Sequence, residues 1–123
     1  MKLVLVVDDD RDIRDSLIEM LEDHGYATLG AGNGLEALEI LRACDEPPCL
    51  ILLDLMMPVM DGREFRAEQL KQPALADIPV IVISAFGDVE AQAATLATDY
   101  MRKPLATRPL MAAVQRHCCA SPS

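Results

Sequence analysis

The chain has 123 residues, of which 51% are hydrophobic, 25% are charged and 3% are aromatic. This length and apolar content predict one globular domain around a single core. Eleven basic residues against 20 acidic ones give a formal net charge of −9. That balance argues against a nucleic-acid or membrane-surface module, because both need basic patches. If the acids gather at one place, they indicate a cation site instead.

Short apolar runs are the candidate strands, and there are five of them: residues 3–7, 26–31, 49–53, 79–83 and 99–102. Residues 3–7 and 80–83 are apolar at consecutive positions, which is typical of strands covered on both faces. Such strands favour a parallel sheet.

Amphipathic stretches alternate with these runs. In residues 11–24, Ile13, Leu17 and Leu21 fall on one side of a helix, and Gly25 is a typical stop. Further helices are predicted from Asn33 or Gly34, over 62–70 with an end at Pro73, over about 88–95, and from Thr107. The alternation predicts an α/β fold of the (βα)5 type, a doubly wound parallel five-stranded sheet with right-handed crossovers. We expect the domain to span residues 1–118, with 119–123 as a short tail.

The four cysteines, Cys44, Cys49, Cys118 and Cys119, show no metal-finger spacing. We expect no secretory leader, because the apolar run of residues 3–7 stops at three aspartates, and no apolar run approaches the roughly 18 residues that a membrane span needs. We therefore expect a cytoplasmic domain whose cysteines are structural thiols.

Side chains that can bind a ligand or take part in a reaction follow the predicted strands. Residues 8–10 are all aspartate, Asp54 follows the third strand, and Ser84 and Lys103 follow the fourth and fifth. In open α/β sheets ligands bind beyond the carboxyl ends of the strands. The sequence thus predicts that carboxylates, a hydroxyl and an ammonium converge at one edge of the sheet.

Carboxylates held close together repel one another, by about 1 kcal/mol per pair at 4 Å in water and about 4 kcal/mol at an effective dielectric constant of 20. A hard divalent cation removes this penalty, and Mg²⁺ favours carboxylates, water and phosphate oxygens. Lys103 beside such a site suits an arriving phosphate. The arrangement indicates phosphoryl transfer to an aspartate.

Four segments carry a resemblance to a known family: VVDDD at 6–10, LLDLMMPVMDG at 52–62, ISA at 83–85 and DYMRKP at 99–104. In this order and spacing they resemble the receiver domain of two-component response regulators, over residues 2–118. The resemblance implies a flavodoxin-like strand order of 2-1-3-4-5.

The resemblance also implies a role for each matching residue. Asp54 would be the phosphoacceptor, and Asp9 and Asp54 would bind Mg²⁺ directly, with Mn²⁺ as a substitute. Asp8 would act mainly through water, and the backbone carbonyl of Met56 would complete the metal site.

Three further residues would respond to the phosphoryl group. Lys103 would pair with the acyl phosphate, Ser84 would hydrogen-bond a phosphoryl oxygen, and Tyr100 would swing inward to follow it. The change would reach an output partner through the face made by the predicted helix 88–95, strand 99–102 and the helix from Thr107. The implied donor is a histidine kinase or a histidine phosphotransfer protein, and dimerisation on phosphorylation is left open.

Some positions depart from the family. Leu96 stands where a glycine is usual, and Asp10 adds a third acid that we expect to point to solvent. Met56 and Phe86 occupy the two positions that tune loss of phosphate, and neither can orient an attacking water. A slow loss of the phosphoryl group is therefore expected.

Two other functions stay open at this point. The acids after the first strand also resemble those of small phosphatases in which Asp8 would be the nucleophile, although 123 residues is short for that fold. The other alternative is a receiver-like binding module that is never phosphorylated. We expect no conventional enzyme, because the chain would catalyse only its own phosphorylation and dephosphorylation.

Overall fold

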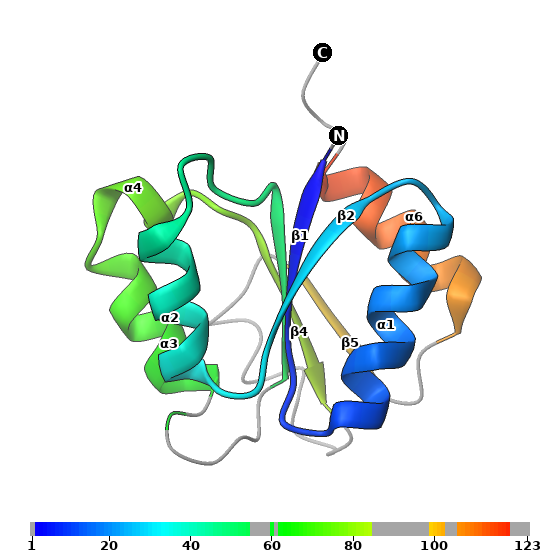
Figure 1. Cartoon of the computed structure of the whole chain (residues 1–123), viewed down its shortest axis with the longest axis horizontal. Helices are drawn as coiled ribbons and strands as arrows, with labels where there is room; N and C mark the ends of the chain where they lie inside the picture. The colour runs from blue at the N-terminus through cyan, green and yellow to red at the C-terminus, as the bar shows by residue number, and fades with distance from the viewer. Residues whose placement is uncertain (1, 55–59, 61, 85–98, 103–105, 119–123) are drawn as a thin grey trace.

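The structure is a computed structural model that describes residues 2–54, 60, 62–84, 99–102 and 106–118. A central sheet lies between two layers of helices (Figure 1). The predicted helix over 88–95 lies outside the described residues. Among the described residues, no helix is long and apolar enough to span a membrane.

The sheet has the predicted strands and order. The strands are β1 (Leu3–Val7), β2 (Ala27–Ala31), β3 (Leu50–Asp54), β4 (Val80–Ser84) and β5 (Asp99–Arg102). They pair in parallel in the order β2-β1-β3-β4-β5, which confirms the doubly wound fold. In Figure 1 β1 runs downward from the N-terminus, so the carboxyl edge of the sheet is at the bottom.

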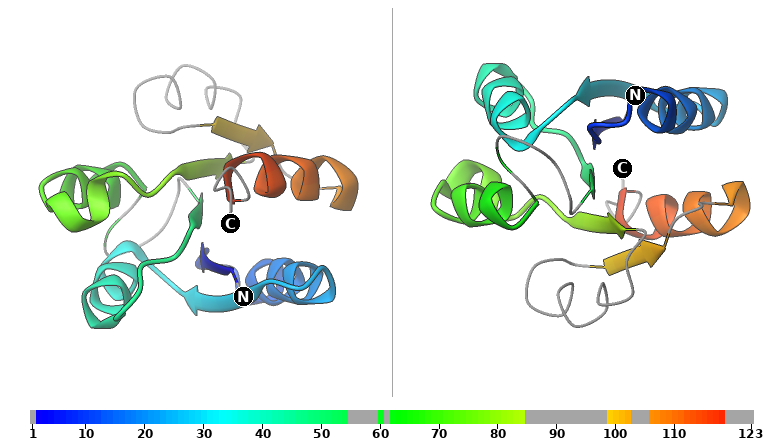
Figure 2. Two further views of the ribbon diagram at one scale, coloured as in Figure 1. Left: turned by 90° about the horizontal axis from the view of Figure 1, so that it is seen from above. Right: turned by 90° about the horizontal axis from the view of Figure 1, so that it is seen from below.

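Helices cover both faces of the sheet, as predicted. They are α1 (Arg11–Asp23), α2 (Gly34–Ala43), α3 (Gly62–Leu70), α4 (Pro73–Ala76) and α6 (Thr107–Cys118). One face carries α2, α3 and α4, and the other carries α1 and α6 (Figure 2). The short helix α4 was not predicted: Pro73 ends α3 as expected but also begins α4, because proline fits the first turn of a helix.

The strands divide the core into two clusters. Leu5 and Val7 face a cluster with α2 and α3 that includes Phe65, whereas Val4 and Val6 face a cluster with α1 and α6. All of these side chains are essentially inaccessible to solvent. Burial on both sides of β1 and β3 explains why their sequences are apolar at every position.

Local signals set the ends of the first two helices. Gly25, with φ of 88°, lies just past α1, where a residue with a Cβ would be strained. Asn33 caps α2 by accepting a hydrogen bond from the Glu36 backbone N–H, and Glu36 accepts one in return from the Gly32 N–H. This arrangement resembles a capping box, in which the Glu36 side chain would accept from the N–H of the capping residue itself. Here it accepts instead from the N–H of Gly32, one residue before the cap.

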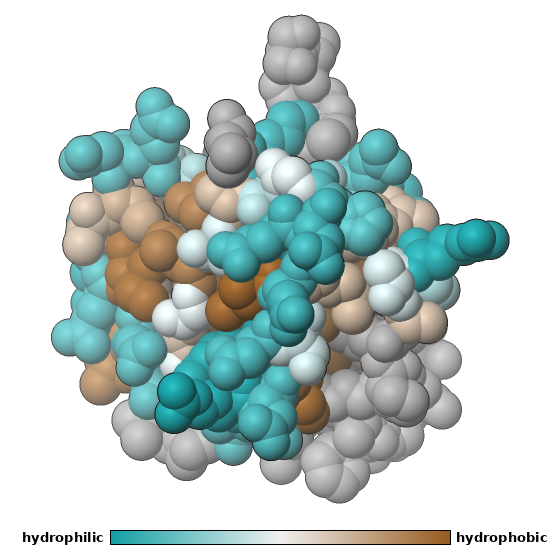
Figure 3. Space-filling model, turned by 45° about the vertical axis from the view of Figure 1, so that its right-hand side comes forward, coloured by the Kyte–Doolittle hydropathy of each residue, from teal (hydrophilic) through white to brown (hydrophobic). Residues whose placement is uncertain are grey.

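The outer face of α1 is polar and mainly acidic. Figure 3 shows a hydrophilic band across this face, beside hydrophobic areas. The exposed acids of α1 include Asp12, Asp15, Glu19 and Glu22. The ion pair of Arg11 with Asp15, at 3.9 Å, is itself highly exposed and contributes little to stability. Much of the net charge therefore lies on solvated helix faces.

Gln69 is a fully buried polar residue that joins α3 to the segment leading into β4. Its Nε2 donates to the backbone oxygens of Leu75 at 2.8 Å and Ile78 at 3.2 Å, and its Oε1 accepts from Arg66 at 2.9 Å. The side chain thus satisfies backbone groups at both ends of the turn between α4 and β4.

Replacing Gln69 with leucine should lower the free energy of unfolding by about 1–3 kcal/mol, because the Ile78 backbone oxygen loses the Gln69 donor and the Leu75 oxygen keeps only the Ile78 N–H. Urea denaturation followed by circular dichroism measures this loss. Gln115→Leu, on the exposed side of α6, is the matched control and should change stability by less than about 0.5 kcal/mol. Equal effects of the two substitutions would contradict this role of Gln69.

The cysteines differ from the expectation of structural thiols. Cys44 is free and half-buried, but Cys49, just before β3, is disulfide-bonded. The expectation is therefore wrong at Cys49: whether two cysteines meet depends on the tertiary fold, which their spacing in the sequence did not reveal.

Candidate functional site

The register of the sheet brings Asp8 and Asp54 together. Val7 of β1 pairs with Leu53 of β3, so the next residue of each chain segment, Asp8 and Asp54, lies at the same carboxyl edge. Both are buried, with exposed fractions of 1% and 5%, whereas Asp9 is exposed. Two buried carboxyl groups at one strand edge are costly unless a cation or hydrogen bonds compensate them.

Asp8, Asp9 and Asp54 form one cluster of carboxylates. One oxygen from each lies within 4.8 Å of the oxygens from the other two. The donor atoms are all carboxylate oxygens, the ligand type that Mg²⁺ prefers. By the chemistry of their donor atoms the three residues form a candidate magnesium site.

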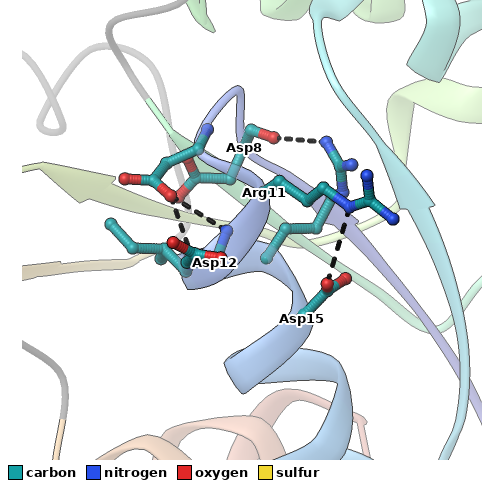
Figure 4. Close-up of polar contacts among 7 residues, drawn as sticks. Asp8, Arg11, Asp12 and Asp15 are labelled. Atoms are coloured by element: carbon teal, nitrogen blue, oxygen red, sulfur yellow. Dashed lines mark hydrogen bonds and ion pairs between the residues drawn. The ribbon is translucent and has the colours of Figure 1, made fainter.

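Asp8 is held by hydrogen bonds on its main chain and side chain. Its N–H donates to the Ala31 backbone oxygen at 3.0 Å, and its Oδ1 accepts from the Asp10 N–H at 2.9 Å. Its backbone oxygen accepts from the Arg14 guanidinium at 3.0 Å. Figure 4 shows Asp8 in the segment before α1, above Arg11, Asp12 and Asp15. These bonds fix both the position and the orientation of the Asp8 carboxylate.

Asp10 belongs to the helix rather than to the cluster. It is exposed, as predicted, and its Oδ1 accepts hydrogen bonds from the N–H groups of Asp12 at 3.0 Å and Ile13 at 3.2 Å. Asp10 is therefore the N-cap of α1. Of the three successive aspartates, Asp10 caps the helix, whereas Asp8 and Asp9 belong to the cluster with Asp54.

Ser84 and Tyr100 are placed by their strands. Asp54 pairs with Ile83, so Ser84 is one residue further along β4 at the same edge, and Ser84 pairs with Arg102 of β5. Tyr100 pairs with Val82, two residues before the carboxyl end of β4. The functional roles of both residues remain predictions. Lys103, Met56 and Phe86 lie outside the described residues, although Lys103 directly follows Arg102 in the chain.

A contact that the sequence did not suggest joins α2 to the segment after Asp54. The Gly34 N–H donates to the backbone oxygen of Met60 at 3.0 Å. A Cβ at Gly34 would lie 2.8 Å from that oxygen and 3.0 Å from the Phe65 Cβ. Only glycine fits here without moving backbone, so Met60, six residues after Asp54, packs tightly against the start of α2.

The fold and the acidic cluster define an α/β domain with a candidate cation site at a strand edge. Comparison of the sequence with protein families gives a match to the response regulator receiver domain over residues 4–115. The chain therefore belongs to the receiver domain family of two-component signalling. In general, receiver domains act with a histidine kinase and are signalling phosphoacceptors rather than conventional enzymes.

Curated relatives include proteins of two lengths. The chain is 39% identical over 122 residues to an uncharacterised 14.6 kDa protein of Leptolyngbya boryana, with 97% of this chain and 92% of that protein covered. It is 43% identical over 112 residues to the response regulator MprA of Mycobacterium ulcerans, covering 89% of this chain. The chain spans about half the length of the MprA relatives that it matches.

Solved structures share the fold. The receiver domain of a histidine kinase from Syntrophus aciditrophicus has a TM-score of 0.89 at 30% identity, covering 99% of this chain and 93% of that one. The response regulator TrrA of Thermotoga maritima, solved in complex with Mg²⁺ and BeF, has a TM-score of 0.84 at 32% identity, with coverages of 94% and 98%. The chemotaxis protein CheY4 of Vibrio cholerae has a TM-score of 0.87 at 29% identity, with coverages of 95% and 98%.

Proposed function

We propose that Asp54 accepts a phosphoryl group from a phosphohistidine in a Mg²⁺-dependent reaction. The donor would be a histidine kinase or a histidine phosphotransfer protein. The observation that carries the proposal is the buried carboxylate of Asp54 within 4.8 Å of those of Asp8 and Asp9, at the carboxyl edge of the sheet. Membership of the receiver family and the Mg²⁺-bound structure of TrrA support it.

In this reaction a carboxylate oxygen of Asp54 attacks phosphorus in line, and the bond from phosphorus to the donor's imidazole nitrogen breaks. Asp8, Asp9, Asp54 and the Met56 carbonyl would hold the metal. When bound, Mg²⁺, or Mn²⁺ in its place, neutralises charge on the phosphoryl oxygens. The Lys103 ammonium would pair with the phosphoryl group.

Phosphorylation would then act as a switch. Ser84, at the same strand edge as Asp54, would hydrogen-bond a phosphoryl oxygen, and Tyr100 would follow it inward. The resulting change would alter the face formed by residues 88–95, β5 and α6, to which an output protein or domain would bind. Neither nucleic acid nor a membrane is expected as a direct partner of this acidic domain.

Phosphorylation by a small-molecule donor tests the proposal without the native kinase. Incubation with acetyl phosphate and Mg²⁺ should add one phosphoryl group per chain, as seen by intact-protein mass spectrometry. Chelation of the metal should prevent the addition. A chain that stays unmodified at saturating donor and Mg²⁺, or one labelled equally well without metal, would contradict the proposal.

The phosphatase alternative makes a different prediction. It requires Asp8 as nucleophile, yet Oδ1 of Asp8 already accepts a hydrogen bond from the Asp10 N–H. A screen with phosphoester substrates separates the two functions. We expect no turnover by the wild-type chain, whereas turnover lost in Asp8→Asn and kept in Asp54→Asn would favour the phosphatase.

The phosphoryl group should be lost more slowly than is usual for receiver domains. Met56 and Phe86 occupy the positions that would otherwise orient the attacking water, and neither side chain has a suitable hydrogen-bonding group. Following label on the purified phosphoprotein after removal of the donor gives the half-life. A half-life of seconds would contradict this expectation.

A further inference from the structure

Arg14 reaches from the first turns of α1 back to the end of β1. Its guanidinium Nη1 donates to the backbone oxygen of Asp8 at 3.0 Å, and its own backbone N–H donates to the Asp10 oxygen at 2.9 Å. The side chain is half-buried. Arg14 thus contacts the main chain of a cluster residue without belonging to the cluster.

Two glycines at the end of β2 make room for this side chain. A Cβ at Gly30 would lie 3.3 Å from the Arg14 Cδ and 3.1 Å from the Ile18 Cδ1, and a Cβ at Gly32 would lie 3.2 Å from the Arg14 Nη1. Both distances to Arg14 are shorter than ordinary van der Waals contact. The path of the arginine is therefore confined along its whole length, from the aliphatic stem to the guanidinium.

We propose that Arg14 is a positioning residue for the metal site, holding Asp8 so that its carboxylate faces Asp9 and Asp54. The proposal rests on the proposed function, in which these three acids bind Mg²⁺. The Asp8 N–H and Oδ1 are fixed by Ala31 and Asp10, and the Arg14 bond fixes the remaining main-chain oxygen. Without the Arg14 hydrogen bond, the peptide group between Asp8 and Asp9 loses the side chain that anchors it. The carboxylates of both residues then move whenever that peptide group moves.

Positioning and simple charge effects predict opposite results for loss of Arg14. A positive charge close to the cluster repels a cation, so its removal alone would tighten Mg²⁺ binding. Loss of the hydrogen bond instead spreads the carboxylates over more orientations and weakens binding. Removal of groups that orient metal ligands commonly costs about 10- to 100-fold in metal affinity.

Isothermal titration of the full chain with MgCl₂ measures the dissociation constant directly. We expect Arg14→Ala to weaken Mg²⁺ binding by about 10-fold. Arg14→Lys keeps the charge, but its side chain is one atom shorter, so binding should also weaken. Arg11→Ala is the matched control: it removes the same charge from an exposed residue of the same helix and should leave the constant within about twofold. Unchanged or tighter binding by Arg14→Ala would overturn the proposal.

Gly32→Ala provides an independent variant that keeps both the charge and the donor. Its Cβ would push on the guanidinium, so we expect a smaller loss of Mg²⁺ affinity, about threefold, with the fold retained in circular dichroism. If Arg14→Ala does not fold, the Mg²⁺ affinity of Gly32→Ala tests the proposal in its place. An affinity equal to that of the wild type would overturn the proposal.

A kinetic measurement separates positioning from general damage. With acetyl phosphate as donor, saturating Mg²⁺ should restore the labelling rate of Arg14→Ala, because only the metal affinity is impaired. A rate that stays low at saturating Mg²⁺ would contradict positioning. If the wild-type chain itself binds no Mg²⁺, the proposed function fails. If it binds Mg²⁺ and the Arg14 variants bind equally well, only this inference fails.

Discussion

Substitution of Asp54 by asparagine should reduce phosphorylation by acetyl phosphate by about 1,000-fold or more, equivalent to at least about 4 kcal/mol in activation free energy. The amide that replaces the carboxylate has the same shape but is not a nucleophile for phosphorus. The substitution also removes one of the three charges of the cluster and so weakens the metal site. Intact-protein mass spectrometry over a time course measures the rate.

Asp45→Asn is a suitable control for this experiment. Asp45 is an exposed acid between α2 and β3, outside the cluster, and its substitution should leave the labelling rate unchanged. Persistent stoichiometric labelling of Asp54→Asn would refute the acceptor assignment. Loss of labelling in both variants would indicate a general charge effect rather than a specific acceptor.

Asp9→Asn should reverse the order of stability between wild type and variant when Mg²⁺ is added. Without metal the variant should be more stable by about 1 kcal/mol, because one carboxylate no longer repels the other two. With Mg²⁺ at 100 times its dissociation constant, the wild type should gain about 2.7 kcal/mol. The variant binds the ion more weakly and gains less.

Urea denaturation with Mg²⁺ or with a chelator gives these four free energies. Asp45→Asn should follow the wild type in both conditions. If Mg²⁺ stabilises Asp9→Asn as much as the wild type, Asp9 is not a ligand. If Asp9→Asn is less stable than the wild type even without metal, repulsion in the cluster is not the dominant effect of Asp9 on stability.

Much of the fold was predictable because its signals are local. Buried strands such as β1 and β3 are apolar at every position, and α1 has both an apolar stripe and Gly25 as a stop. Once strands and helices alternate, right-handed crossovers leave few arrangements of the sheet. The cluster of Asp8, Asp9 and Asp54 follows from the same reasoning, since parallel strands end at one edge.

Features that depend on the path of a single side chain were not predictable. Arg14 reads as an ordinary surface residue of a helix, because no sequence pattern shows that its side chain turns back to the Asp8 oxygen or that glycines of the β2 segment lie beside it. Gln69 gives no sign in the sequence that it is buried, because its partners are backbone oxygens of the following turn. The four-residue helix α4 is too short to show a helical period.

The most direct test of the central claim locates the phosphoryl group in the wild-type chain. Phosphorylation with acetyl phosphate and Mg²⁺, followed by reduction with borohydride, converts a phosphorylated aspartate to homoserine, which peptide mass spectrometry can locate. We expect homoserine at residue 54 and aspartate at residues 8 and 9. Homoserine at Asp8 or Asp9 with Asp54 unmodified would contradict the assignment of Asp54 as the phosphoacceptor.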